Sequence, residues 1–177
     1  LSRAGKKVAV LGVPQTFPVR PVNGCLVSGF LAPDTNADYT YPKALKTELT
    51  EAIGEYIIDV KDFRTDDKER LLQRVHELME NRFDAALHLL KNKPWDFFMM
   101  VEMGVDRRHH GFWKYCDRDH PAYEPGNPFE HAIRDFYQAV DRRIGELLAC
   151  ADEHTAVLVV SDHGARAMHG GICVNQW

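Results

Sequence analysis

Short apolar runs alternate with amphipathic segments along the chain. The runs at 7–13, 56–60, 97–103 and 157–160 have the length and the branched or aromatic residues of buried strands. Strands that alternate with helical patterns indicate βαβ units and a mainly parallel sheet. We therefore expect one α/β domain over residues 1–177, in three layers, with helices on both faces of the sheet.

The segments between these runs carry helix signals. Residues 42–53 predict a short helix. Thr65 is suited to cap the next one, whose apolar stripe continues to about Lys91. A third helix is expected after Asn127, a favourable N-cap followed by Pro128 at the first helical position.

Two stretches read as irregular loops, residues 14–41 and 116–127. The first is rich in Pro, Gly, Asn and Asp, yet it carries too many apolar residues for a free linker. We expect both loops to lie near a functional site. The chain has no initiator Met, and its first residues read as the last turn of a helix that stops at Gly5. We therefore expect a fragment of a longer catalytic domain, incomplete at both ends.

Composition narrows the class of protein. The formal net charge is −4, and Lys and Arg are scattered, which argues against a nucleic-acid polymer as partner. No apolar run approaches the roughly 18 residues of a membrane span, and no signal peptide is evident. The cysteines form no CxxC pair, so we expect reduced thiols and a cytoplasmic location. They are Cys25, Cys116, Cys150 and Cys173.

Candidate chemistry follows two of the predicted strands. Asp162 and His163 come directly after the run at 157–160, and Asp106 and His110 follow the run at 97–103. A right-handed crossover between parallel strands brings both exits to the same rim of the sheet, where α/β proteins bind ligands. Carboxylate oxygens and imidazole nitrogens are ligands for zinc, and also for manganese or iron. The pattern favours a hydrolytic site with two divalent metal ions.

Other interpretations of single residues stay open. Asp106 could cap a helix that starts at Arg107, and His163 could be a turn residue bonded to backbone. His169 lies six residues after His163 and is either a further metal ligand or a loop histidine. Arg107 and Arg108 are candidates for contact with substrate phosphate, or they are solvated side chains near the rim.

These motifs resemble the alkaline phosphatase superfamily, in particular its type I phosphodiesterase/nucleotide pyrophosphatase branch. Ser161–Gly164 is similar to one signature of the branch, and Asp106–His110, followed by Phe112 and Trp113, to a second. The likeness extends over most of the chain, through Gly170–Trp177 at one end. At the other end it includes residues 5–10, 14–18 and 22–24.

The resemblance implies an alkaline-phosphatase-like fold and hydrolysis of phosphodiester or pyrophosphate bonds in a small phosphorylated substrate. It also implies that a Ser or Thr hydroxyl attacks phosphorus in line, between two metal ions. By this resemblance the nucleophile and one more Asp ligand lie upstream of Leu1, and a further His ligand lies beyond Trp177. The fragment alone is then expected to be inactive. The alternatives are a phosphotransferase or mutase, a sulfatase-type member, or a non-catalytic metal-binding module.

Overall fold

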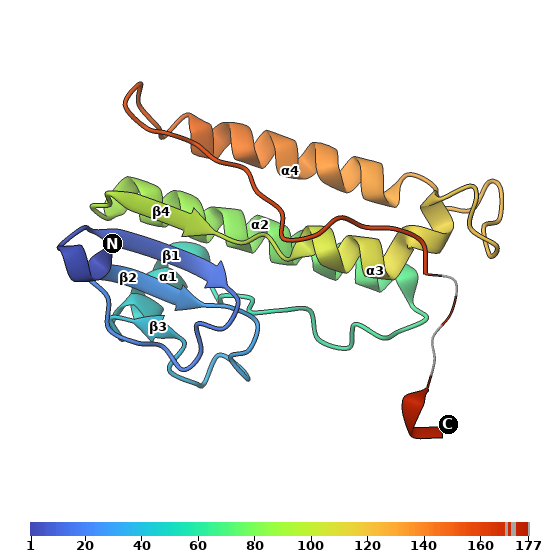
Figure 1. The fold of residues 1–177 in the computed structure, drawn as a ribbon, viewed down its shortest axis with the longest axis horizontal. Helices are drawn as coiled ribbons and strands as arrows, with labels where there is room; N and C mark the ends of the chain where they lie inside the picture. The colour runs from blue at the N-terminus through green and yellow to red at the C-terminus, as the bar shows by residue number, and fades with distance from the viewer. Residues whose placement is uncertain (169, 171–172, 177) are drawn as a thin grey trace.

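The computed structural model describes residues 1–168, 170 and 173–176 (Figure 1). Four strands form one sheet in these residues, in the order β3-β2-β1-β4. The central strand β1 (Val8–Val13) runs parallel to β2 (Gly24–Ser28) and to β4 (Phe97–Met100), and the short β3 (Thr40–Tyr41) pairs antiparallel with β2. The expected mainly parallel α/β fold is confirmed.

The helices are α1 (Leu45–Ile53), α2 (Lys68–Asn92), α3 (Gly104–Cys116) and α4 (Ala132–Leu148). Short 3-10 turns, η1 (Ser2–Ala4) and η2 (Val174–Gln176), lie near the two ends of the described chain. α3 packs against α2 and α4, and its first residue follows the end of β4 by four positions. Of the two hydrophobic cores in the described residues, the second is formed by α2, α3 and α4. It contains Leu71, Val75, Met79, Phe83, Phe112, Phe136 and Val140.

The first core joins one face of the sheet to α1 and α2. Ala9 is in register with Cys25 on one side and with Phe98 on the other, so these side chains share a face. This face packs on the apolar sides of the two helices, through Leu45, Leu49, Ala85, Ala86 and Leu89. The opposite face carries Phe97 and Met99, each 38% exposed. In the described residues, both helices of this core therefore lie on the same face of the sheet.

Two predicted strands are not part of the sheet. Residues 56–60 lie beside α2, and side chains of that helix satisfy their backbone: Ile57 N donates to Asn81 Oδ1 (2.8 Å), and Arg82 Nη2 donates to Ile58 O (3.1 Å). Residues 157–160 are irregular and between 52% and 86% exposed. An apolar run gives the preference for a strand, but a ladder also requires a neighbouring edge to supply its hydrogen bonds.

The loop prediction for residues 14–41 was wrong at two places, because β2 and β3 lie inside this segment. Its apolar residues Leu26 and Val27 are buried in the sheet. The Pro, Gly, Asn and Asp residues of the segment favoured a loop and hid a five-residue strand. Residues 117–127 contain no helix or strand.

The helix caps also differ from the predictions. Asp67, not Thr65, caps α2, since its Oδ1 accepts a hydrogen bond from Arg70 N (3.0 Å). α4 begins five residues after Asn127, which instead fixes the preceding turn by accepting a hydrogen bond from Phe129 N (2.9 Å). None of the helices in the described ranges is long and apolar enough to cross a membrane.

Candidate metal-binding site

Asp106 lies in the first turn of α3, just beyond the end of β4. His110 follows one helical turn later, and its Nε2 lies 3.4 Å from Asp106 Oδ1. The expectation that a helical segment turns both side chains toward the same point agrees with this geometry.

Asp162 and His163 reach the same place from the irregular C-terminal segment, which runs beside α3 (Figure 1). His163 Nε2 lies 4.0 Å from Asp106 Oδ1 and 3.8 Å from Asp162 Oδ1. The structure thus brings His110 and His163 to within 4.0 Å of Asp106 Oδ1, and Asp162 lies beside His163. It does so without the strand from which the juxtaposition was predicted.

The orientation of the His163 ring is set by its backbone. Nδ1 lies 2.8 Å from Gly164 O, so this nitrogen carries the proton and Nε2 is left facing the carboxylates. The same bond to Gly164 is the main reason that the pKa of His163 is raised, and the nearby charges of Asp162 and Asp106 raise it further. In the charged, doubly protonated ring Nε2 also carries a proton, and a metal ion would have to displace that proton to bind Nε2.

The spacing of the donor atoms within each Asp–His pair suits one metal ion. Two tetrahedral zinc ligands at 2.0–2.1 Å from the ion are separated by about 3.3 Å. The Asp106–His110 separation of 3.4 Å matches this value, and the Asp162–His163 separation of 3.8 Å is somewhat longer. Within the ranges that the structure describes, no group of three or more His, Cys, Asp or Glu residues is arranged to hold a metal ion. The residues present fit two half-sites, each made of one carboxylate and one imidazole. His169, the fifth predicted ligand, lies outside the described residues, so its role stays a prediction.

Arg107 is engaged with two carboxylates. Its Nη1 donates to Asp106 Oδ2 (3.1 Å), while Nε and Nη2 donate to the two oxygens of Asp59 at 3.0 and 2.5 Å. The bonds to Asp59 are the main cause of the raised pKa of Arg107. Sequence reasoning missed Asp59 because it assigned this residue to a strand; a lone carboxylate inside an apolar run was the available signal.

Arg108 lies away from the site. Only 3% of the residue is exposed, and its guanidinium faces the rings of Phe112 and Phe136 at 5.2 and 4.6 Å. Nη2 donates to Leu72 O (2.8 Å), and burial lowers the pKa of the side chain to about 10. The structure therefore does not bring Arg108 to the place where Asp106 meets His163.

A buried polar cluster lies behind the end of β4 and was not anticipated from the sequence. Glu102 accepts a hydrogen bond from Gly104 N through Oε1 (2.5 Å), and its Oε2 has no partner. Burial raises the pKa of Glu102 to about 7, although the nearby charge of Arg82 opposes the shift. Arg82 is only 2% exposed and stacks on the ring of Tyr56 at 5.1 Å. The signal was present: Glu102 ends an apolar run, and Arg82 interrupts the apolar stripe of α2.

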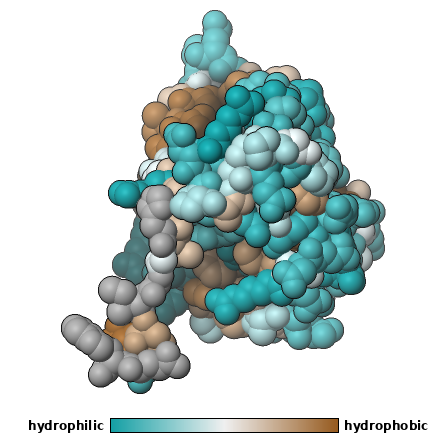
Figure 2. Space-filling view, turned by 90° about the vertical axis from the view of Figure 1, so that its right-hand side faces the viewer, coloured by the Kyte–Doolittle hydropathy of each residue, from teal (hydrophilic) through white to brown (hydrophobic). Residues whose placement is uncertain are grey.

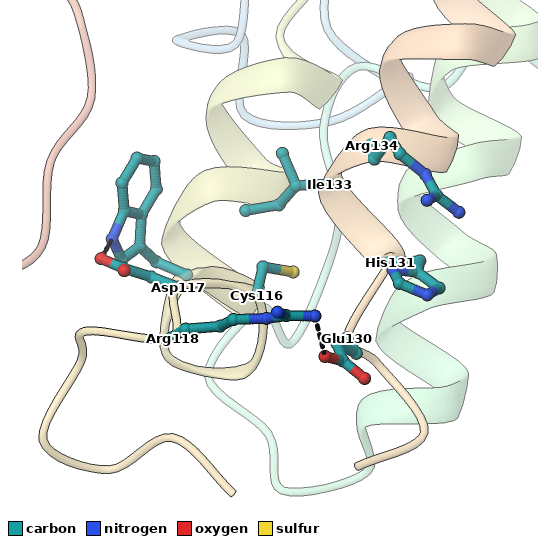
Figure 3. A pocket seen from close by; sticks show the side chains of 8 residues that line it. Cys116, Asp117, Arg118, Glu130, His131, Ile133 and Arg134 are labelled. Carbon is teal, nitrogen blue, oxygen red and sulfur yellow. Dashed lines mark hydrogen bonds and ion pairs between the residues drawn. The ribbon is translucent and has the colours of Figure 1, made fainter. Parts of the chain in front are cut away.

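Further along α3, the side chains turn to other partners. His109 packs between Trp113 and Tyr137, with ring centroids 5.6 and 5.7 Å apart, and burial lowers its pKa. Beyond Trp113 lies a surface hollow that contains none of the candidate ligands; Arg118 and Glu130 pair across it at 3.1 Å (Figure 3). It is lined by Trp113, Cys116, Asp117, Arg118, Glu130, His131, Ile133 and Arg134.

The end of the molecule toward which β1 and β4 point has a mainly hydrophilic surface (Figure 2).

The model of the family described as type I phosphodiesterase / nucleotide pyrophosphatase matches residues 1–177. The chain belongs to this family. Comparisons with curated proteins and with solved structures gave no match. The type I phosphodiesterase/nucleotide pyrophosphatase family is a family of phosphodiesterase and pyrophosphatase hydrolases.

Proposed function

We propose that this protein is a metal-dependent hydrolase of phosphodiester or pyrophosphate bonds in small phosphorylated substrates. The observation that carries the proposal is the convergence of both motifs on one atom. His110 and His163 approach Asp106 Oδ1 from a helix and from a distant segment, at 3.4 and 4.0 Å. The family match over residues 1–177 supports the class of reaction.

In this proposal Asp106 and His110 hold one divalent ion, and Asp162 and His163 hold a second. Zinc is the favoured metal because paired imidazole and carboxylate donors suit it, and manganese and iron are the alternatives. When bound, such ions polarise a phosphoryl oxygen and stabilise developing charge. His169 is proposed as an additional ligand. We assign the nucleophilic hydroxyl to a residue outside these 177.

The chain's own residues orient the donors. The first turn of α3 fixes Asp106 relative to His110, and the bond from His163 to Gly164 O directs the ring nitrogen Nε2 toward the carboxylates.

We also propose a cytoplasmic location, which the four free cysteines support and which cell fractionation would test.

The deciding experiment uses the full-length protein. After removal of metal with a chelator, we expect hydrolysis of bis(p-nitrophenyl) phosphate to return on addition of zinc, manganese or iron. Asp162→Ala or His110→Ala should abolish this metal-dependent turnover. His154→Ala serves as the matched control, because His154 is an exposed histidine of the same segment whose ion pair is with its neighbour Glu153.

Two results would refute the proposal. Full-length protein that binds metal and hydrolyses no phosphate ester or anhydride would instead indicate a non-catalytic metal-binding module. Turnover of a sulfate ester, or phosphoryl transfer without net hydrolysis, would place the protein with the sulfatase or phosphotransferase branches of the superfamily.

A further inference from the structure

The two oxygens of the Asp106 carboxylate face different partners. Oδ1 is the atom approached by His110 and His163. Oδ2 accepts a hydrogen bond from Arg107 Nη1 at 3.1 Å. The two oxygens are equivalent, so what Arg107 fixes is the plane of the carboxylate: one oxygen faces the guanidinium, and the other therefore faces the imidazoles.

Arg107 is itself fixed by a second carboxylate. Its Nε and Nη2 donate to the two oxygens of Asp59, which is a bidentate arrangement with well-defined geometry. The side chains are only 18% exposed for Arg107 and 25% for Asp59. The guanidinium also lies within 5.7 Å of the ring of Phe30 and 5.6 Å of the ring of Phe63.

Charge gives the second reason for the arrangement. A guanidinium with no other anion would share its full positive charge with Asp106 and could bond to both of its oxygens. Asp59 accepts two of the three hydrogen bonds, which leaves Asp106 Oδ1 without a bond to the guanidinium and free to act as a ligand. Partners behind a metal ligand commonly change metal affinity by 10–100-fold when they are removed.

We propose that Arg107 and Asp59 form a positioning pair for Asp106. The role of Arg107 is then to orient the Asp106 carboxylate, not to contact the substrate. The inference rests on the proposed metal site. It predicts that the pair sets the affinity of the ion held by Asp106 and His110 and leaves the ion held by Asp162 and His163 largely unaffected.

The test measures binding of Zn²⁺ alone to the full-length protein, by competition with a chromophoric chelator. Asp59→Asn and Arg107→Met should each weaken one of two zinc equivalents by about 10–100-fold. Arg107→Lys, which keeps the charge but not the bidentate geometry, should fall between these variants and wild type. Melting temperatures measured without metal show how much each change destabilises the fold.

Glu48→Gln is the matched control. Glu48 forms a comparable half-buried contact, with Lys93 Nζ at 2.5 Å and His88 Nε2 at 2.8 Å, and it shares no residue with the site. It should lower the melting temperature without changing zinc affinity by more than about twofold.

The two ideas fail in different ways. If Asp106→Ala removes a zinc equivalent while Asp59→Asn and Arg107→Lys bind zinc as wild type does, the positioning pair is wrong and the metal site stands. If wild type binds no zinc, or Asp106→Ala binds as much as wild type, the metal site is wrong and the positioning pair falls with it.

Discussion

Nη1 of Arg82 occupies the space in front of Gly12: a Cβ atom built on Gly12 would lie 1.7 Å from it. Gly12 has φ +71°, in the left-handed region. Arg82 has little freedom to move away, because it is 2% exposed and its Nη2 donates to Ile58 O at 3.1 Å. The end of β1 therefore accommodates a buried guanidinium because position 12 has no side chain.

Gly12→Ala should destabilise the protein by about 2–4 kcal/mol, since the cost of the left-handed backbone adds to the overlap with Arg82. Chemical denaturation gives the free energy of unfolding. Gly5→Ala is the control: Gly5 has φ +78°, but nothing lies within 4 Å of the Cβ position, so only about 1 kcal/mol is expected. Equal losses in the two variants would show that Arg82 simply yields.

Glu102 makes stability depend on pH. Its pKa is raised from 4.5 to about 7 in the folded protein, chiefly by burial. The folded state therefore holds a proton that the unfolded state has lost, and stability falls as pH rises through this window. Arg82 and the backbone N–H of Gly104 oppose the shift.

Glu102→Gln removes this dependence because the amide stays neutral. Relative to wild type, the variant should gain about 1–3 kcal/mol in free energy of unfolding between about pH 5 and about pH 8. Unfolding by urea at several pH values measures the difference. A difference that does not vary with pH would mean that Glu102 titrates normally in the folded protein.

Asp67 should matter more to α2 than Thr65 does. Asp67→Ala removes the acceptor of Arg70 N and leaves an N-terminal amide without its cap, at a cost of about 1 kcal/mol. Thr65 Oγ1 accepts a bond from Asp67 N at 3.2 Å, outside the helix, so Thr65→Ala should cost less. Thermal unfolding of both variants ranks them, and the reverse order would restore Thr65 as the cap.

The parts of the fold that local sequence determines were predictable. The apolar stripe of α2 and the run that forms β4 follow from spacing alone, and the candidate ligands Asp106 and His110 follow from their position after that run. Pairing partners were not predictable in this way. Residues 56–60 and 157–160 have the composition of strands, but whether a segment joins a sheet depends on which edge is free beside it.

The burial and the partners of three charged residues were also not predictable from the sequence. Asp59, Arg82 and Glu102 look like surface residues in a list of amino acids, since charged groups are seldom buried without partners. Asp59 and Arg82 bond to segments distant in sequence: Asp59 and Arg107 are 48 positions apart, and Arg82 and Ile58 are 24 apart. Only the folded chain shows that such residues face one another, and the positioning pair behind Asp106 could not be derived from spacing.

Arg108 offers a direct test of a sequence-based expectation. Because its Nε and Nη1 have no hydrogen-bond partner in the described structure, Arg108→Met should change the free energy of unfolding by less than about 1 kcal/mol or increase it. The Michaelis constant for a phosphodiester substrate should not change in the full-length protein. A rise of about tenfold or more in the Michaelis constant would indicate that Arg108 contacts the substrate. That result would contradict its position between Phe112 and Phe136.

The last prediction concerns the number of ions. His110→Ala and His163→Ala should each lower the zinc content of the full-length protein from about two equivalents to about one, since each imidazole belongs to a different half-site. Asp106→Ala should likewise remove one equivalent, the ion that Asp106 holds with His110, and leave the ion held by Asp162 and His163. Native mass spectrometry resolves the stoichiometry of each variant. If either histidine variant loses both equivalents at once, the four residues form a single interdependent site, and the division into two half-sites is wrong.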